Sequence, residues 1–490
     1  MDPAKDLHDA DPGPVVAEAM RALREEREHR AGVRERVFGN REFFKLWLAQ
    51  FVSALGDWLG LLAITITAQR VGGGSGAAAV GLVMTARIAP GFFFGPIAGV
   101  VVDRFDRKKV MVVCDLARAG VLVFLPFVDT VAGLVFASLL LEVFTLLWSP
   151  AKEASVPNLV APERLATSNS LSLAAAYGTF PVASVLFALL ATAAKGLAHI
   201  DALDALRVNQ EALAFYFDVL TFCTSAFLIS RLALGAATRS SDDHEASPTF
   251  KQTLTELREG WKLIFLNPIV RAVIVGLATG LIGGGMVVPL GAIFSTEVLH
   301  AGASGYGTFV TALGFGAAVG VVGVNFAQRK LSKDFLFTIG IGGAGAAMVA
   351  AAASSALWLS TLCVGGFGIG AGTAYVVGYT MLHEHVDDEY RGRIFSALYT
   401  IVRLCLLVAF AVGPFLSSAL DGLSLRLFDD RLLALPGGGH IFLPGVRLTL
   451  WLGGIVILLA AVLVVLSLRA EHRHRTKEQL APETTTEATT

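Results

Sequence analysis

The stretch GVVVDRFDRKKVM, residues 99–111, decides the fold of this chain, because six charged residues occupy the seven positions 103–109 directly after a long apolar run. A helix needs about 20 mostly apolar residues to cross the roughly 30 Å hydrocarbon core of a bilayer. The run at residues 77–102 meets that length, and the charge cluster ends it. The stretch therefore predicts a membrane-spanning helix that ends at a short charged loop.

The composition of the whole chain agrees with a membrane environment. The 490 residues are 54% hydrophobic and 16% charged, and the mean hydropathy is +0.65. Soluble domains carry about 25% charged residues. The net charge of −1 gives no bias toward nucleic acid, and the four cysteines lie at scattered positions in apolar runs, which fits neither a disulfide framework nor a metal site. We therefore expect an integral membrane protein without a nucleic-acid partner or a metal.

Apolar segments of spanning length recur along the chain, which predicts an all-α membrane protein with twelve transmembrane helices. The expected helices are 43–70, 77–102, 109–128, 131–150, 168–194, 211–231, 269–293, 305–327, 335–353, 356–380, 396–420 and 446–468. Residues 1–41 are highly charged and read as a cytoplasmic segment, not as a cleavable signal peptide.

The placement of basic residues predicts the orientation. With the N-terminus inside, thirty of the 39 Lys and Arg residues lie at cytoplasmic ends or loops, six lie at outer ends or loops, and three lie inside helices. Basic residues favour the cytoplasmic side of membrane proteins. We expect a multi-pass protein of the cell membrane with both termini in the cytoplasm.

The longest polar break falls between the sixth and seventh helices, which divides the helices into six plus six. This symmetry is typical of transporters that are built from two similar halves; the alternative is one twelve-helix bundle with an ordinary loop. The expected units are a charged N-terminal segment, an N-terminal half, a cytoplasmic central loop, a C-terminal half and a cytoplasmic tail, at residues 1–41, 42–231, 232–268, 269–468 and 469–490. The loop 421–445 is expected to be external, and the stretch LPGGGHIFLPG in it, residues 435–445, is expected to be irregular.

The loop after the second helix carries a recognisable spacing. Gly99, Asp103, Arg104, Arg107 and Lys108 follow the order G-x-x-x-D-R-x-x-R-K. This order resembles the signature loop of the major facilitator superfamily, with Asp106 where a glycine is common. Together with SPAKEASVPNLV at 149–160, the loop resembles the drug and metabolite exporter branch that includes macrolide-efflux and enterobactin-export proteins. The resemblance implies twelve helices in two halves and a transport function.

The signature loop suggests a gate. Gly99 would let a neighbouring helix approach, and Asp103 would lie at the start of the eleventh helix, near Ser396, where the helix dipole favours an anion. Arg104, Arg107 and Lys108 would pair with carboxylates or lipid phosphates. Such a lock would close the cytoplasmic side. The alternative is a tight turn whose bases only fix the topology.

Four ionisable residues fall near the middle of predicted helices: Asp57, Arg87, Arg118 and Glu142. Charges at this depth are costly and usually mark pathways or pairs. In the functional interpretation, Asp57 and Glu142 bind a proton or the cationic part of a substrate. In the structural alternative they form fixed pairs, Asp57 with Arg87 and Glu142 with Arg118, although Asp115 could also neutralise Arg118. Asp218, Arg403 and His383 lie nearer helix ends and are expected to reach toward the interface.

Glycines mark the seventh helix, where GLATGLIGGGMVVP places Gly280 and Gly284 one turn apart before Pro289. Gly276 continues the same face, and similar spacings occur in the eighth and tenth helices. Small residues allow close helix contact, which is the default interpretation. A glycine run that ends in proline also weakens a helix, so we expect the seventh helix to bend during transport.

These features predict a secondary active transporter and not an enzyme, because no nucleotide, metal or nucleophile motif is present. We expect a monomer without cofactors that exports a small amphipathic molecule, such as a drug, siderophore or metabolite, by alternating access. Its partners would be the substrate, protons as the coupling ion, and membrane lipid. The alternatives are a lipid or lysophospholipid flippase, an importer, and a membrane sensor or scaffold that transports nothing.

Overall fold

The computed structural model describes residues 37–102, 104–197, 211–233, 267–386, 388–434 and 440–480. Helices make up nearly all of this part of the chain. The long helices are α3 (Arg41–Gly72), α4 (Gly76–Val102), α5 (Arg107–Phe124), α6 (Val131–Ser155), α7 (Leu165–Gly178), α8 (Phe180–Leu197), α9 (Ala212–Ser230), α11 (Pro268–Gly285), α12 (Val287–Glu297), α13 (Gly302–Ala327), α14 (Lys333–Ala353), α15 (Leu357–His385), α16 (Asp388–Leu407), α17 (Gly413–Leu427) and α18 (Gly445–Leu480).

Short elements join or interrupt these helices. They are η1 (Gly73–Ser75), η2 (Leu125–Phe127), η3 (Val156–Asn158), η4 (Pro162–Arg164), the π-helical turn η6 (Val408–Val412), η7 (Asp429–Arg431), β1 (Leu432–Ala434) and β2 (His440–Phe442). The two strands pair antiparallel, with Leu433 opposite Ile441. Residues 435–445 were expected to be irregular, and strand β2 at His440–Phe442 corrects that expectation for this part of the stretch. Residues 435–439 lie outside the described residues.

The expected twelve helices agree with the structure. Among the described residues, eleven stretches are long and apolar enough to cross a membrane, and the first of them, Arg41–Gly91, contains α3 and the first part of α4. The predicted boundaries hold within a few residues at most ends. The eleventh helix begins earlier than expected, at Asp388, and the twelfth continues to Leu480. The proposed N-terminal segment and central loop lie almost wholly outside the described residues.

Three of the predicted helices are interrupted near their middle. The fifth is divided at Thr179 into α7 and α8, just before Pro181, which cannot donate a backbone hydrogen bond. The seventh is divided at Met286 into α11 and α12, between the glycines and Pro289. The eleventh carries η6 just before Gly413. Such interruptions occur where a helix kinks. The seventh helix is thus divided next to its glycines, and its movement during transport stays a prediction.

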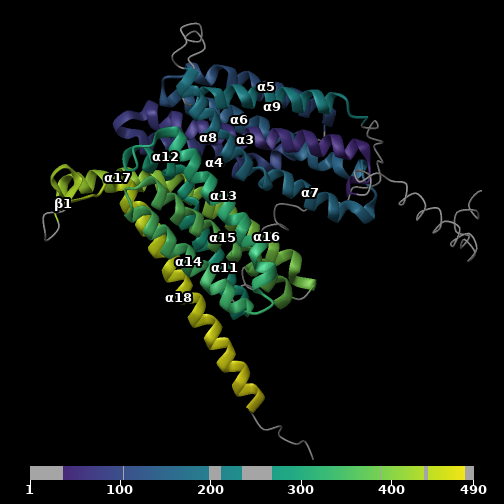
Figure 1. Cartoon of the computed structure of the whole chain (residues 1–490). Coiled ribbons are helices and arrows are strands. Elements are labelled where there is room, and N and C mark those ends of the chain that lie inside the picture. The colour runs from purple at the N-terminus through teal and green to yellow at the C-terminus, as the bar shows by residue number, and fades with distance from the viewer. Residues whose placement is uncertain are drawn as a thin grey trace, which may run out of the picture.

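The helices form two halves that meet at one end of the molecule. Figure 1 shows α3, α5, α6 and α9 in the upper part of the view and α11, α14, α15 and α18 in the lower part, whereas α12 and α17 lie beside α4 where the two halves meet. The long helices of the two halves diverge from this contact. We call the end with residues 104–106 and 328–331 the basic face, because Arg104, Arg329 and Lys330 are exposed there. The end with residues 73–75 and 298–301 is the opposite face. The chain thus has the two-half architecture expected from its sequence.

Contacts between the halves gather toward the opposite face. There α8 packs on α13, and α17 packs on α4. Small residues bring these helices close, since a Cβ at Gly307 would lie 2.7 Å from the Cα of Ala188, and a Cβ at Gly81 would lie 3.2 Å from the ring of Phe415. The halves are therefore joined at the opposite face and spread toward the basic face.

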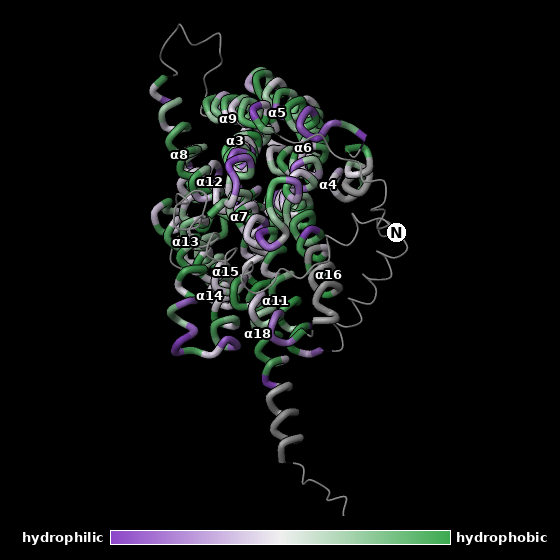
Figure 2. Tube along the Cα trace, turned by 90° about the vertical axis from the view of Figure 1, so that its right-hand side faces the viewer, coloured by the Kyte–Doolittle hydropathy of each residue, from purple (hydrophilic) through white to green (hydrophobic). Residues whose placement is uncertain are grey.

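Apolar side chains cover the outside of the helices. Phe136, Leu362 and Val462 are among the exposed large hydrophobic residues. Figure 2 shows hydrophobic colour along most helices and hydrophilic colour at turns between them, as at the turn from α13 to α14. An outer surface of this kind suits hydrocarbon and not water, so the protein is a multi-pass membrane protein.

Glycines bring backbones together in the C-terminal half. The position of a Cβ at Gly316 overlaps the carbonyl oxygen of Gly365, and the position at Gly368 overlaps that of Leu313, so α13 and α15 touch backbone to backbone. α14 meets α15 in the same manner through Gly340. These contacts confirm the packing interpretation for the glycines of the eighth and tenth helices, because no larger residue fits there.

Candidate functional site

Asp57 and two arginines meet within the N-terminal half. Asp57 lies on α3, Arg87 on α4 and Arg118 on α5. Asp57 Oδ1 is 3.8 Å from Arg87 Nη2, and Asp57 Oδ2 is 3.4 Å from Arg118 Nη1. The Asp57 side chain remains 32% exposed. The predicted pair of Asp57 and Arg87 is present, and Asp57 also bridges to Arg118.

Arg118 is held firmly inside this half. Its side chain is only 1% exposed and donates to the buried carboxylate of Asp115, which also accepts a hydrogen bond of 2.7 Å from Ser225 Oγ. The guanidinium carbon lies 4.2 Å from the ring centroid of Phe222 and 5.4 Å from that of Trp148. Cation–π contacts and a buried carboxylate stabilise a guanidinium that has lost its water. The conformation of Arg118 is therefore fixed by α5, α6 and α9.

Glu142 on α6 lies apart from these pairs. The expected alternative, a fixed pair with Arg118, is not present. No basic side chain of the described residues comes within 4.0 Å of its carboxylate, since Arg118 pairs with Asp115 and Asp57. Glu142 is half-buried, and its Oε1 would lie 3.5 Å from a Cβ at Gly91 of α4. The Glu142 carboxyl group thus has no basic partner in direct contact among the described residues.

A fourth acid, Asp218, was expected to reach toward the interface, and this expectation is wrong. Its side chain is 1% exposed and accepts a hydrogen bond of 2.9 Å from Thr221 Oγ1. The carboxyl group occupies the space over Gly56 and Gly60 of α3, and a Cβ at Gly60 would lie 2.6 Å from Asp218 Oδ2. The spacing of Gly56 and Gly60, one turn apart, is a sequence signal that could have indicated a close neighbour and was missed.

Carboxyl groups outnumber guanidinium groups in this cluster. Among the described residues, the basic side chains close to Asp57, Asp115, Glu142 and Asp218 are Arg87 and Arg118. We call these six residues the acidic cluster. Guanidinium groups stay protonated in proteins, so two of the carboxyl groups have no internal counter-charge. Such a cluster is chemically suited to bind protons or an organic cation.

The signature loop lies at the basic face. Asp103 is outside the described residues, and the Arg104 side chain is exposed. Arg107 Nη1 donates to the carbonyl of Ala154 at 2.7 Å, and Lys108 Nζ donates to that of Leu232 at 2.8 Å. These two bases bind the carboxyl ends of α6 and α9, where the helix dipole favours cations. Their predicted pairing with carboxylates or lipid phosphates stays a prediction.

Two further positions of the loop differ in their surroundings. Asp106 accepts a hydrogen bond of 3.0 Å from the backbone N–H of Lys109 and so begins α5, which gives a local reason for an acid where a glycine is common. A Cβ at Gly99 would meet no heavy atom of the described residues within 4 Å. The close helix approach expected at Gly99 is therefore not made in this conformation.

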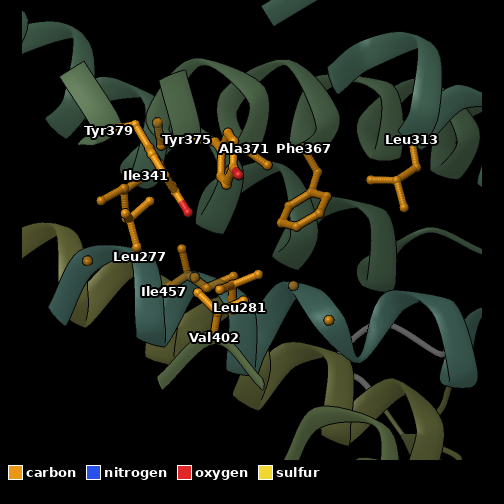
Figure 3. A pocket seen from close by; sticks show the side chains of 16 residues that line it. Leu277, Leu281, Leu313, Ile341, Phe367, Ala371, Tyr375, Tyr379, Val402 and Ile457 are labelled. Atoms are coloured by element: carbon orange, nitrogen blue, oxygen red, sulfur yellow. The ribbon is translucent and has the colours of Figure 1, made fainter. Parts of the chain in front are cut away.

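A cavity lies within the C-terminal half. It has a volume of about 230 Å³ and is lined by residues of α11, α13, α14, α15, α16 and α18. Figure 3 shows Phe367, Tyr375 and Tyr379 of α15 opposite Leu277 and Leu281 of α11. Among the described residues, none that lines the pocket is charged. We call this cavity the apolar pocket.

The glycines predicted to make the seventh helix flexible border the apolar pocket. A Cβ at Gly276 would lie 2.6 Å from Ile341 Cδ1, and one at Gly284 would lie 2.5 Å from Phe367 Cζ, whereas one at Gly280 would meet nothing within 4 Å. Gly276 and Gly284 serve close packing, and Gly280 faces open space. Pro289 follows the break at Met286 and is buried in α12. The structure divides this helix where the prediction placed its bend.

Curated proteins of similar sequence are membrane transporters. A transporter of Bacillus subtilis (strain 168), the uncharacterized MFS-type transporter YkuC, is 26% identical over 73% of this chain and 81% of its own. The putative bacilysin exporter BacE of Bacillus subtilis is 26% identical over 68% of this chain and 78% of its own. Macrolide efflux protein A of Streptococcus pyogenes is 24% identical over 82% of this chain and 92% of its own.

Solved structures of the same fold belong to transporters as well. A bacterial homolog of the human lysosomal transporter Spinster has a TM-score of 0.63 and 15% identity, over 88% of this chain and 97% of its own. A bacterial homologue of the iron transporter ferroportin has a TM-score of 0.59 and 15% identity, over 87% of this chain and 98% of its own. Residues 46–410 match the family described as Major Facilitator Superfamily. The chain belongs to the major facilitator superfamily and has relatives of the drug and metabolite exporter type.

Proposed function

We propose that the protein is a secondary active exporter that moves small amphipathic molecules out of the cell in exchange for protons. The observation that carries the proposal is the excess of carboxyl groups in the acidic cluster. An unpaired charge at membrane depth is costly. A bound proton and the cationic group of a substrate each remove this cost, and competition between them couples their movements.

Glu142 is the first candidate for the coupling group. Asp115 is engaged by both Arg118 and Ser225 and is fully buried. Asp57 bridges two arginines. Glu142 has no basic side chain of the described residues within 4.0 Å, so a change in its protonation disturbs no existing ion pair. Asp57 is the second candidate, because its side chain is partly exposed.

The two-half architecture supplies the motion. The halves touch toward the opposite face and diverge toward the basic face (Figure 1). Rocking them about the acidic cluster would open the two faces in turn, as alternating access requires. We assign the basic face to the cytoplasm, with both termini on that side of the plasma membrane. In the other half of the cycle, Asp103 would lock the basic face, and α11 would bend against α12.

Two relatives are named as exporters, one of bacilysin and one of macrolides. Both names favour export over import for this chain. Neither name fixes the substrate, so the proposal is limited to small molecules with a cationic or polar part and an apolar part. A lipid of the bilayer is the competing substrate class, and the experiment below separates the two.

The experiment uses the purified full chain in liposomes whose interior is acidic. Ethidium, an aromatic cation, is the probe. Wild-type protein should accumulate ethidium inside, and a protonophore should abolish accumulation. Glu142→Gln should lose gradient-driven accumulation and retain ethidium exchange between equal concentrations. Glu163→Gln, which changes an exposed carboxylate of η4 at the basic face, is the control and should behave as wild type.

Each other outcome revises a stated part of the proposal. Accumulation that persists with the protonophore would remove proton coupling. Protonophore-sensitive accumulation by Glu142→Gln would move the coupling role to Asp57. Movement of a fluorescent phospholipid in place of ethidium would make the protein a flippase.

A further inference from the structure

We propose that Asp218 of α9 is a second proton site, so that two protons are exchanged for each substrate molecule. The inference rests on the proposed export function and deepens it by giving the number of protons. Glu142 remains the group at which substrate and proton compete, and Asp218 adds one proton to the part of the cycle without substrate. With a singly charged substrate, each turnover then moves one net charge across the membrane.

Asp218 is enclosed by the protein without a cation beside it. Its side chain is 1% exposed, and no ion pair between described residues includes it. Thr221 Oγ1 donates to Asp218 Oδ1 at 2.9 Å, and a Cβ at Gly60 would lie only 2.6 Å from Asp218 Oδ2. An isolated carboxylate in such surroundings is costly and takes up a proton instead. Asp218 is therefore a neutral acid in this conformation.

The charged neighbours of Asp218 do not neutralise it. α3 presents Asp57 to it, whereas α4 and α5 present Arg87 and Arg118. Both arginines already pair with Asp57. α8 also packs on α9, but its charged residue, Lys195, donates to a hydroxyl group of α13. The cations around Asp218 thus serve other partners, and a proton is the available means of neutralising it.

One helical turn separates Asp218 from a cation that can replace its proton. The guanidinium carbon of Arg118 lies 4.2 Å from the ring centroid of Phe222, and Phe222 follows Asp218 by four residues on α9, so both lie on one face of the helix. The contact of Arg118 Nη1 with Asp57 Oδ2 is long, at 3.4 Å. Arg118 Nε is buried and donates to no group of the described residues, although buried donors are nearly always paired. Arg118 therefore has donors to spare for a carboxylate at position 218.

Substrate binding provides the trigger for proton release. The carboxyl groups of Glu142 and Asp57 act on each other electrostatically, so a substrate cation that displaces the proton of Glu142 also attracts Asp57. Arg118 Nη1 is then released from Asp57 and pairs with Asp218. The O–H bond of the Asp218 carboxyl group breaks, its electron pair stays on the carboxylate, and the proton passes to water on the open side. When the substrate leaves, Arg118 returns to Asp57 and Asp218 takes a proton from water.

The first measurement detects the proton on Asp218 directly. At neutral pH, the infrared spectrum of the purified full chain should contain the C=O stretching band of a protonated carboxyl group that Asp218→Asn lacks. The asparagine amide has the shape of the protonated acid and still accepts from Thr221, so the variant should fold. Glu163→Gln, a change of an exposed carboxylate in η4, should retain the band. A spectrum unchanged by Asp218→Asn would mean that Asp218 is ionised and would overturn the proposal.

The second measurement counts the protons through the charge that moves. The full chain is placed in liposomes with equal pH on both sides, and valinomycin with a potassium gradient makes the interior positive. For each ethidium that enters, two protons leave, so one positive charge leaves the liposome. The potential should therefore drive ethidium inward, opposite to the direction of a freely diffusing cation. Propidium, the doubly charged analogue of ethidium, should not respond, because its exchange for two protons moves no net charge.

Asp218→Asn should lose the response of ethidium to the potential, because exchange for one proton is electroneutral. It should still accumulate ethidium in liposomes with an acidic interior and no potential. The limiting ratio should be about tenfold for one pH unit, instead of about hundredfold for wild type with two protons. Glu163→Gln should match wild type in both measurements. A slower Asp218→Asn that keeps the response to the potential would show that Asp218 only packs α9 against α3, and would overturn the proposal.

Failure of the export proposal is distinguishable from failure of the second proton. If a pH gradient drives ethidium accumulation by wild type and the potential does not, export stands and the two-proton exchange falls, whether or not Asp218→Asn folds. If wild type transports nothing and the infrared band of Asp218 is present, export and the stoichiometry fall, while the proton on Asp218 stands. If the band is absent as well, both proposals fall.

Discussion

The carboxyl group of Asp218 on α9 occupies the space beside the Cα of Gly56 on α3, where any side chain at position 56 would stand. The same carboxyl group reaches over Gly60 one turn later. An acid in the membrane is thus accommodated by the absence of two side chains on the neighbouring helix. The contact also fixes α9 against the helix that carries Asp57, so the position of the acidic cluster depends on it.

Gly56→Ala should destabilise the protein, because the new methyl group overlaps both Asp218 and Thr221. Overpacking of a tight site costs about 1–3 kcal/mol. The thermal unfolding midpoint of the purified protein should fall. Gly120→Ala on α5, where a Cβ meets nothing within 4 Å, should leave the midpoint unchanged or raise it. Equal midpoints for both variants would show that Asp218 adapts without cost.

Arg118→Met should destabilise the N-terminal half more strongly. It leaves the buried carboxylate of Asp115 without its cation and removes the contact of the guanidinium with Phe222. Breaking a buried pair costs about 3–5 kcal/mol, whereas replacing both partners by apolar residues is far less costly. The double change Arg118→Met with Asp115→Leu should therefore recover stability. A double variant that is less stable than Arg118→Met would contradict a pairing role for Arg118.

Ethidium binding should depend on pH through Glu142. Only the ionised carboxyl group attracts a cation, so binding should strengthen as pH rises and weaken as protons compete at lower pH. For one competing proton, the affinity falls about tenfold per pH unit once the protonated form dominates. Glu142→Gln should bind more weakly and with a flatter pH profile. An identical profile in both proteins would exclude Glu142 from the competition.

The assignment of the basic face to the cytoplasm is tested by labelling. A single cysteine is placed at Gly74 or at Lys330 after Cys114, Cys223, Cys363 and Cys405 have been replaced by serine or alanine. Both positions are exposed, at opposite faces of the molecule. In intact cells a membrane-impermeant maleimide should label position 74 and not position 330. The reverse pattern would invert the topology.

Much of the fold could be predicted because its determinants are local. The charge cluster after Val102 and the cap at Asp106 fix the ends of α4 and α5 within a few residues of the prediction. The break in the seventh helix also follows from local features, since glycines and Pro289 weaken one turn. The fourth helix was expected to end at residue 150 and instead continues through Pro150 to Ser155. A proline inside a helix removes one backbone hydrogen bond, and a transmembrane helix tolerates this loss where neighbouring groups satisfy the freed carbonyl.

The acidic cluster was only partly predictable. The sequence indicates how deep a residue lies in the membrane and on which face of its helix, but it does not show which other helix packs against that face. Asp57 and Arg87 were expected to pair because they lie at the same depth in the membrane, and this pair is present. The same reasoning allowed Glu142 to pair with Arg118, but Arg118 points to Asp115 and Asp57. Asp218 was misplaced because its distance from the helix end was used as a measure of exposure. Its burial depends on how α9 packs against α3, which no local pattern encodes.

The backbone contacts among α13, α14 and α15 have a mechanical consequence. Where carbonyl oxygens of one helix touch the Cα atoms of the next, as at Gly316 and Gly368, no flexible side chain remains between them to absorb a shift. We therefore expect these three helices to move as one stiff plate. Bending is expected instead in the neighbouring helices, at Met286 between α11 and α12 and at the π-helical turn Val408–Val412 before α17. Spin labels within the plate would keep constant separations through the transport cycle, while labels on α12 or α17 would move relative to it.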